Sequence, residues 1–195
     1  MRRIAALIPA AGRSSRYGRC KQLVTLDGKP LLQRAVDLAN AVVPGAVFVV
    51  TGADHQRIAE TIRDAVLIRN PDWKAGLGRS IARGVERLAA DYDGILIMLA
   101  DQIALDREDL QRLCDGFDGG NIVCAHYGER RGVPALFCRE RFHRLQRLTG
   151  DRGAKALLQD AHLPVNEVPM AHAAVDIDTQ EDLDRWLRKS VEANC

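Results

Sequence analysis

Short, continuous apolar runs recur along the chain and are separated by segments with helical periodicity. The runs occupy residues 4–8, 46–50, 66–68, 95–99 and 122–125, and the run at 66–68 is the weakest. Continuous apolar runs of this length are typical of strands that are buried on both faces of a sheet. The pattern therefore predicts strands at these places, in a sheet that is covered by helices on both sides.

Apolar residues three and four positions apart predict helices between these strands. The predicted helices cover residues 30–43, 55–66, 80–90, 106–114 and 179–193. Ser80 and Asp106 stand where an N-cap is expected, and Thr179 and Asp182 have the spacing of a capping box. Strands that alternate with helices imply βαβ units, a mostly parallel sheet and right-handed crossovers.

Residues 121–178 have a different pattern, in which predicted strands follow one another closely. The segments 121–128, 132–138, 165–170 and 173–177 are predicted strands, and 141–148 and 153–161 are predicted helical segments. We interpret this region as an antiparallel addition at one side of the same sheet. Because no linker or repeat is visible, residues 1–195 are expected to form a single Rossmann-like domain with three α/β/α layers.

Composition limits the class of protein. Of the 195 residues, 47% are hydrophobic, enough for a sizeable core. Lys and Arg total 28 against 26 Asp and Glu, which argues against a dedicated nucleic-acid binder. The five cysteines form no CxxC pair, so we expect reduced thiols in a cytoplasmic protein. No segment approaches the ~18 apolar residues of a membrane span, and we expect no membrane partner.

The segment AAGRSSRYGRCK directly follows the first predicted strand and contains Gly12 and Gly18. Its four cations are Arg13, Arg16, Arg19 and Lys21. Glycines let backbone N–H groups approach phosphate oxygens, and ligands of open α/β sheets bind beyond the carboxyl ends of the strands. The loop is therefore predicted to bind a polyanion, with a spacing that is neither a Walker A loop nor GxGxxG. The alternative is a basic connection that faces solvent.

Asp101 follows the apolar stretch GILIMLA, which reads as a central strand. Its carboxylate is expected at the carboxyl edge of the sheet, where a hard cation can bridge a carboxylate and nucleotide phosphates. The alternative role is a helix cap, for which Asp106 is better placed. Gly76, Gly78 and Ser80 precede a helix whose N-terminus favours anions, and a plain loop with a capping serine is the alternative there.

Other candidate groups carry weaker signals. The five histidines stand at positions 55, 126, 143, 162 and 172, without the spacing of a catalytic triad or a metal cluster. We therefore treat them as ordinary residues. Trp73 and Trp186 are expected to pack against other side chains rather than to stack on a ligand.

Five segments spread along the chain have the sequence pattern of one known family. AAGRSSRYGRCKQL matches xAAGxSxRxGxxKxL, with Ala11, Gly12, Ser14, Arg16, Gly18, Lys21 and Leu23 in register. LADQ at 99–102, GERRGVPALF at 128–137, TGDRGAKALL at 149–158 and VDIDTQEDL at 175–183 match LADQP, GxRGHPxxF, GDxGAxxLL and DIDTPEDL. The chain thus resembles the MobA-like nucleotidyltransferases, especially the molybdenum cofactor cytidylyltransferases. Ile103, Val133 and Gln180 depart from the pattern, and the Val133 change leaves the acceptor substrate open.

The resemblance implies a nucleotidyltransferase, in which an acceptor phosphate attacks the α-phosphorus of a nucleoside triphosphate and pyrophosphate leaves. It implies CTP as the nucleotide, molybdopterin as the acceptor, Mg²⁺ as the cofactor, and a molybdenum hydroxylase or its chaperone as a further partner. The tripeptide at 10–12 favours CTP, because guanylyl members tend to have two glycines there. A guanylyltransferase, a sugar-phosphate nucleotidyltransferase and a non-catalytic molybdenum cofactor carrier remain alternatives.

The resemblance also implies a set of site residues. The catalytic residues are Lys21, Arg16 and Asp101. The nucleotide-binding residues would be Ala10, Ala11, Gly12, Arg13, Ser14, Gly18, Gly76 and Ser80. Thr51 joins them by position alone, because it ends the second predicted strand and its backbone could contact the base. Mg²⁺ would bind Asp101 and a second carboxylate, for which we choose Asp178 and keep Asp176 in reserve. Two carboxylates that are distant in sequence are then expected to hold one cation at the sheet edge.

Overall fold

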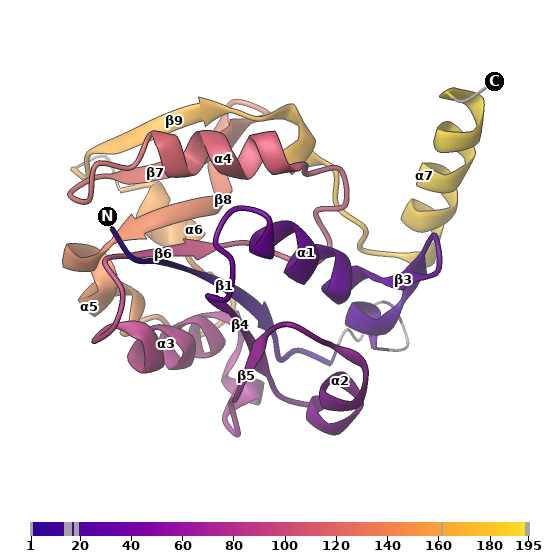
Figure 1. The fold of residues 1–195 in the computed structure, drawn as a ribbon, viewed down its shortest axis with the longest axis horizontal. Coiled ribbons are helices and arrows are strands. Elements are labelled where there is room, and N and C mark those ends of the chain that lie inside the picture. The colour runs from indigo at the N-terminus through magenta and orange to yellow at the C-terminus, as the bar shows by residue number, and fades with distance from the viewer. Residues whose placement is uncertain (1, 14–16, 18–19, 161, 194–195) are drawn as a thin grey trace.

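The predicted apolar runs form strands of one seven-stranded sheet, which is shown in Figure 1. The computed structural model describes residues 2–13, 17, 20–160 and 162–193. The sheet has the order β5-β4-β1-β6-β8-β7-β9. These strands are β1 (Ile4–Ala10), β4 (Val47–Thr51), β5 (Val66–Arg69), β6 (Gly94–Ile97), β7 (Ile122–Tyr127), β8 (Arg130–Cys138) and β9 (Val165–Pro169). Strands β2 (Thr25–Leu26) and β3 (Lys29–Pro30) form a separate antiparallel pair.

The sheet combines a parallel part with the predicted antiparallel addition. Strands β5, β4, β1 and β6 run parallel to one another. Strand β8 is antiparallel to both of its neighbours, β6 and β7, and β9 pairs parallel to β7. Ile97 at the end of β6 faces Ala135 of β8. The first residues of β8 therefore lie beside the carboxyl end of β6, where a ligand is expected.

Helices cover both faces of the sheet, which confirms the predicted Rossmann-like three-layer fold (Figure 1). Side chains of α1 (Leu31–Asn40), α2 (His55–Thr61) and α4 (Arg107–Asp115) join one apolar cluster. Side chains of α3 (Leu77–Leu88), α5 (Phe142–Leu145) and α6 (Lys155–Leu158) join the other. Strand β1 contributes side chains to both clusters, because Ala6 and Ile8 point to one face of the sheet and Ala5 and Leu7 to the other.

The remaining elements are short 3₁₀ helices and the last helix. The 3₁₀ helices are η2 (Lys21–Leu23), η3 (Trp73–Ala75), η4 (Arg139–Arg141) and η5 (Ala171–Ala174), and the last helix is α7 (Gln180–Ala193). Figure 1 shows α7 standing beside β3 and extending away from the sheet. In the described part of the chain, no helix has both the length and the apolar character needed to cross a membrane.

Helix α3 begins earlier than predicted, so the proposed Ser80 cap is wrong. Gly76 takes the N-cap position, with a φ of 96° that favours glycine. A Cβ on Gly76 would lie 2.5 Å from the backbone of Gly150, so the loop at Gly150 packs directly on the start of the helix. Gly78 also donates its N–H to the Gly150 carbonyl over 2.8 Å. Ser80 consequently lies within α3, where it is buried.

The segment 173–177, predicted as a strand, is also different in the structure. Residues 171–174 form η5, and the chain continues without joining the sheet. Its polar backbone groups find other partners: the Ala173 carbonyl accepts from Gln102 Nε2, and the Ile177 N–H donates to the Asp101 carbonyl. An apolar run of this length is compatible with a strand, but these contacts near Asp101 replace the ladder.

Two predicted helix caps are confirmed. The Asp106 side chain accepts from the Asp109 N–H over 2.8 Å, and the Asp109 side chain accepts from the Asp106 N–H over 3.2 Å. Thr179 and Asp182 make the corresponding pair at the start of α7. Both capping boxes join a helix to the segment before it, and in α7 that segment carries Asp178.

Candidate active site

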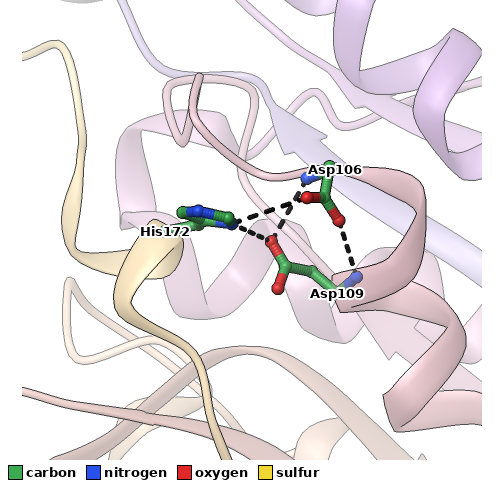
Figure 2. A group of neighbouring side chains, drawn as sticks. All are labelled: Asp106, Asp109 and His172. Atoms are coloured by element: carbon green, nitrogen blue, oxygen red, sulfur yellow. Dashed lines mark hydrogen bonds and ion pairs between the residues drawn. The ribbon is translucent and has the colours of Figure 1, made fainter.

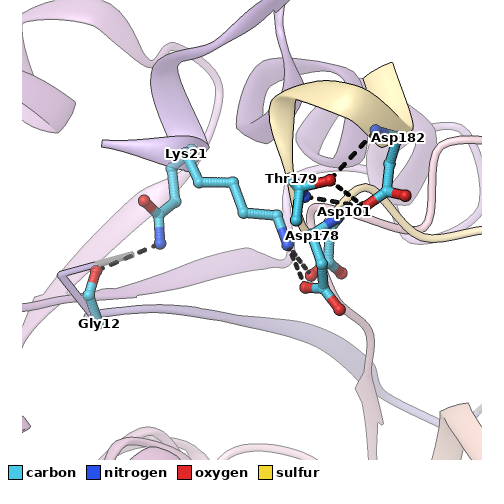
Figure 3. A network of polar contacts seen from close by, with 7 residues as sticks. Gly12, Lys21, Asp101, Asp178, Thr179 and Asp182 are labelled. Carbon is cyan, nitrogen blue, oxygen red and sulfur yellow. Dashed lines mark hydrogen bonds and ion pairs between the residues drawn. The ribbon is translucent and has the colours of Figure 1, made fainter. Parts of the chain in front are cut away.

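Lys21, Asp101 and Asp178 meet beyond the carboxyl end of β6 (Figure 3). Lys21 Nζ donates to Asp101 Oδ2 over 2.7 Å and to Asp178 Oδ1 over 2.8 Å. The Lys21 side chain is only 14% exposed. Three segments that are far apart in sequence thus place one cation between two carboxylates at the edge where ligands of open α/β sheets bind.

Asp101 is held by the backbone around it. Its carbonyl accepts the N–H groups of Ile103 over 3.0 Å and of Ile177 over 3.1 Å. The bond from Ile177 brings the segment that carries Asp178 next to the loop that follows β6. Asp101 Oδ1 is buried and has no hydrogen-bond partner among the residues that the structure describes. A buried carboxylate oxygen without a donor is costly unless a ligand satisfies it.

The Asp178 backbone is fixed from its C-terminal side. The Asp182 carboxylate accepts the N–H groups of Asp178 and Thr179, over 3.1 and 2.8 Å, as Figure 3 shows for Thr179. Tyr17, in the loop after β1, donates its hydroxyl to Gln180 Oε1 over 3.0 Å. The start of α7 is therefore tied to the loop that leads to Lys21, which keeps Asp178 within reach of the ammonium.

The segment before Asp178 is fixed by Gln102. Its side-chain Nε2 donates both to the Val133 carbonyl over 2.8 Å and to the Ala173 carbonyl over 2.9 Å. This one buried amide joins the loop after β6, strand β8 and η5. Gln102 was not among the predicted site residues, because its two partners become neighbours only in the folded chain.

His172 adds a second anchor for the same segment (Figure 2). Its Nδ1 lies 2.8 Å from Asp109 Oδ2 and 3.6 Å from Asp106 Oδ2, so the ring joins the capping box of α4. One possible ligand atom from each of the three residues lies within 4.8 Å of the others. The sequence predicts the Asp106 cap, but it does not connect His172 with that cap, and we interpreted His172 as an ordinary residue. The reason is that 63 residues separate His172 from Asp109. These atoms are already bonded to one another and to the helix, so we assign the group a structural role.

The charges around Asp109 are balanced in favour of its ionised form. Burial alone would raise the pKa of the Asp109 carboxyl, but hydrogen bonds from His172, Arg112 and the Asp106 N–H outweigh burial and lower the pKa. Arg112 Nη2 lies 2.7 Å from Asp109 Oδ1. The ionised carboxylate therefore stabilises the fold at neutral pH.

Asp109→Asn is expected to reduce the free energy of unfolding at pH 7 by about 2 kcal/mol, because hydrogen bonds to a charged group are lost. The contribution requires ionised Asp109, whose folded-state pKa is lowered. It is therefore complete above the unfolded-state pKa of about 3.9 and is lost as the pH falls through the folded-state value. Urea unfolding of wild type and Asp109→Asn at several pH values from 7 to 3 measures the difference in the free energy of unfolding. The exposed Asp115→Asn, in the same helix, is the control. An Asp109→Asn loss that does not shrink in acid would contradict the assignment.

Two other groups in the site have shifted pKa values. Burial alone would lower the pKa of Lys21, but the charges and hydrogen bonds of Asp101 and Asp178 outweigh it and raise the pKa. The pKa of Asp176 is also raised, first by partial removal from water and then by the negative charges of Asp178 and Asp101. The site thus keeps a protonated lysine beside a cluster of carboxyl groups.

The predicted phosphate loop is described only in part. Ser14, Arg16 and Gly18 lie outside the described residues. Gly12 and Arg13 are exposed, and the Gly12 carbonyl accepts from Gln22 Nε2 over 3.4 Å, as drawn in Figure 3. The exposed backbone at Gly12 is accessible to a ligand, on the same side of the sheet edge as Lys21.

The other predicted nucleotide-binding residues lie at the carboxyl ends of β1 and β4 and at the start of α3. Ala10 and Ala11 are buried, and Ala10 pairs with Thr51. The buried Thr51 hydroxyl lies 2.7 Å from His55 Nδ1 and also donates to the Ile68 carbonyl. The buried Ser80 hydroxyl accepts from Asn70 Nδ2 over 3.1 Å. The structure therefore uses both hydroxyl groups for contacts within the protein.

Two cavities share Leu99 as a lining residue, and Asp101 lines the smaller one. A small one, of about 50 Å³, is lined by Lys21, Asp101 and Leu99, among others. Leu99 also lines a cavity of about 230 Å³ between α3, β8 and the loop before α6. Around the larger cavity stand four cations and one acid: Arg130, Arg131, Arg152, Lys155 and Asp151. The larger of these two cavities thus offers a basic site for an anion, and Leu99 lies between it and the cavity lined by Lys21.

The sequence from residue 6 to residue 168 matches the family described as MobA-like NTP transferase domain. The chain belongs to this family. The family resemblance inferred from the five motifs is therefore confirmed. The match identifies the family alone, so the molybdenum cofactor specificity that the resemblance implies stays a prediction.

Similar proteins include curated relatives that are longer than this MobA-like chain and solved structures of about its own length. The bifunctional protein GlmU of Bifidobacterium animalis subsp. lactis is 34% identical over 119 residues, which are 57% of this chain and 26% of GlmU. The chain spans about a quarter of the length of the curated relatives it matches.

Among solved structures, a homologue of Mycobacterium tuberculosis Rv0371c from Mycobacterium sp. strain JC1 has a TM-score of 0.83 and 27% identity, covering 99% of this chain and 100% of that chain. M. tuberculosis Rv0371c in complex with manganese has a TM-score of 0.78 and 26% identity, covering 95% and 98%. The described part of the chain thus has the fold of these structures.

Proposed function

We propose that this protein is a Mg²⁺-dependent nucleotidyltransferase that transfers CMP from CTP to molybdopterin and releases pyrophosphate. The observation that carries the proposal is the meeting of Lys21, Asp101 and Asp178 at one edge of the sheet. Phosphoryl and nucleotidyl transfer depend mainly on positioning and on neutralising charge, and this site supplies both cationic and anionic groups for that purpose.

Lys21 is the residue best placed to stabilise the charge that develops on the α-phosphoryl group. Its pKa is raised, so the ammonium stays protonated when a phosphate approaches. The flexible side chain begins at η2, directly after the glycine-containing loop, so it can follow a triphosphate bound along that loop. Arg13, which is exposed, and Arg16 would add charge along the same path.

The carboxylates of Asp101 and Asp178 suit a hard cation. Asp101 Oδ1, which has no partner in the described part of the chain, and the partly exposed Asp178 offer oxygen ligands, which Mg²⁺ prefers. Bound Mg²⁺ would neutralise the phosphate charge and favour pyrophosphate departure. The manganese in the Rv0371c complex supports a divalent cation in a protein of this fold. Asp178 is our choice for the second ligand, because it contacts the same ammonium as Asp101, and Asp176 is the alternative.

The larger cavity is the candidate site for the acceptor. Its wall beside β6 is apolar, with Ile97, Leu99 and Val133, while Arg130 and Arg152 stand among its basic residues. A molybdopterin-type acceptor has a ring system and a phosphate, which match an apolar wall and basic residues respectively. Because Leu99 lines both cavities, we expect a phosphate bound in the larger one to be able to approach the α-phosphoryl group past this residue.

Pyrophosphate release is the experiment that tests the function. The purified protein is incubated with Mg²⁺, each of the four nucleoside triphosphates, and either molybdopterin or a sugar phosphate. We expect release with CTP and molybdopterin, and little release when either is omitted. Release only with a sugar phosphate would favour the sugar-phosphate alternative. No release with any pair, together with tight molybdopterin binding, would favour a carrier.

CTP is expected to exceed GTP in kcat/KM by at least roughly tenfold. Gly52 packs between the Ala11 carbonyl and Trp73, and a Cβ there would come within 2.6 Å of both. Ala11 is buried in an apolar cluster against which Trp73 packs, so its methyl group helps to fix the backbone beyond β1, and we expect the space beside this backbone to suit a pyrimidine better than the larger purine. Ala11→Gly removes this methyl group, loosens the backbone and should weaken the preference. Equal wild-type rates with both nucleotides would overturn the base choice alone.

A further inference from the structure

The Lys21 ammonium bridges the same two carboxylates that are proposed to bind a metal ion. Its Nζ lies 2.7 Å from Asp101 Oδ2 and 2.8 Å from Asp178 Oδ1. A divalent cation approaches carboxylate oxygens to about 2.0–2.6 Å. A cation that binds Asp101 Oδ2 and Asp178 Oδ1 would therefore need the space that the ammonium fills. At these two oxygens, one of the two must leave before the other can bind, although Asp101 Oδ1 has no partner among the described residues.

We propose that Lys21 and a divalent cation exclude one another at this carboxylate pair, so that Lys21 is the counterion of Asp101 and Asp178 in the nucleotide-free protein. The inference rests on the proposed metal role of the two aspartates. It adds an order of events: a nucleotide draws the ammonium toward its phosphates, and this frees both carboxylates for the cation. Without a nucleotide, the cation binds both carboxylates only at a concentration high enough to displace the ammonium. The metal ion thus arrives with the nucleotide rather than before it.

The charges at the site support this exclusion. With Lys21 in place, one positive charge already offsets part of the charge on the two carboxylates, and a divalent cation would be repelled by the ammonium. Asp101 is 23% exposed and Lys21 14% exposed, so solvent screens this repulsion only in part. The lysine side chain has the reach to change partners, because it is a flexible four-carbon stem with three donors.

Manganese binding to the nucleotide-free protein tests the exclusion without measuring activity. Electron paramagnetic resonance titration of Mn²⁺ compares wild type with Lys21→Met, which keeps the unbranched stem of the side chain, one atom shorter, and removes its charge. We expect Lys21→Met to bind Mn²⁺ more tightly, by on the order of tenfold. Lys21→Arg keeps the charge and is expected to bind as weakly as wild type. Lys29→Met is the matched control, since Lys29 pairs with Asp37 on α1.

A second substitution separates the exclusion from the metal assignment on which it rests. Asp178→Asn in the Lys21→Met background is expected to abolish the gain in Mn²⁺ affinity. If Lys21→Met binds Mn²⁺ no more tightly than wild type, the exclusion is wrong, whatever the pyrophosphate assay shows. If the gain persists without Asp178, the cation binds elsewhere and the inference also fails.

The wild-type protein provides a test that does not depend on a variant folding. Lys21 is held between two carboxylates, so its reductive methylation, followed by mass spectrometry, is expected to be slow. Saturating Mn²⁺ should displace the ammonium and accelerate methylation of Lys21, while the rate at Lys29 stays constant as an internal reference. An unchanged Lys21 rate under saturating Mn²⁺ would show that cation and ammonium do not compete.

Discussion

Lys21→Ala is expected to lower the rate of pyrophosphate release by roughly 10²- to 10³-fold, the loss typical when one preorganised donor to a transition state is removed. Lys21 is the described cation that contacts both Asp101 and Asp178, which places its charge at the proposed reaction centre. The loss should appear mainly in kcat, because the charge on the α-phosphoryl group grows in the transition state. Steady-state kinetics with CTP, Mg²⁺ and molybdopterin measure it.

The fold should survive this substitution. The turn at η2 is held by backbone hydrogen bonds from Leu23 to Cys20 and from Val24 to Lys21, which do not involve the lysine side chain. Circular dichroism and thermal unfolding check this. Lys29→Ala removes an ammonium that pairs with Asp37 and should leave the rate unchanged. Near-normal pyrophosphate release by Lys21→Ala would show that this loop does not stabilise the transferred group.

Asp101→Asn is expected to have an effect of similar size, a roughly 10²-fold or greater loss of turnover, because a neutral amide is a much weaker ligand for Mg²⁺ than a carboxylate. Calorimetry provides a second measurement. Wild type should bind CTP more weakly when EDTA removes Mg²⁺, whereas Asp101→Asn should bind CTP almost equally in both conditions. If the affinity of wild type for CTP is the same with and without EDTA, the proposal that Mg²⁺ bridges Asp101 and the nucleotide is wrong.

The controls for this prediction are an aspartate on the other side of β6 and the two candidate aspartates near the start of α7. Asp91 is exposed and lies before β6, whereas Asp101 lies after it, so Asp91→Asn should have no effect. Asp178→Asn and Asp176→Asn distinguish the two candidates for the second ligand. We expect the larger loss of Mg²⁺ dependence from Asp178→Asn, and the reverse order would assign the ligand to Asp176.

The strands of the sheet could be predicted from the sequence, because a strand that is buried on both faces appears there as a continuous apolar run. The runs at 4–8 and 95–99 became β1 and β6, with shifts at their ends. The segment 173–177 is also apolar, but it does not pair with any strand of the sheet, because its backbone groups form hydrogen bonds with Asp101 and Gln102. Ser80 failed as a cap because the backbone of Gly150 sets the start of α3, and this contact is tertiary.

A residue of the candidate site could be predicted from the sequence only where its position in its own strand or helix also shows where in the fold it lies. Asp101 follows a central strand, so the sheet edge was its expected place. The contacts that complete the site connect distant segments: Gln102 with Ala173, and His172 with Asp109. Single-sequence periodicity contains no information about such pairs, because each partner alone looks like an ordinary polar residue on a loop or a helix.

The pairing of residue 21 with residue 178 also sets the moment in protein synthesis at which the site first exists. Lys21 and Asp101 leave the ribosome well before Asp178, and at about 5–20 residues per second the interval is roughly 4–15 s. During that interval β1, β4, β5 and β6 are already available to pair, but one carboxylate of the site is still missing. A nascent chain can therefore begin to form its sheet before it has a complete site. Its activity would begin as one late event, when the segment around Asp178 docks on the loop after β6.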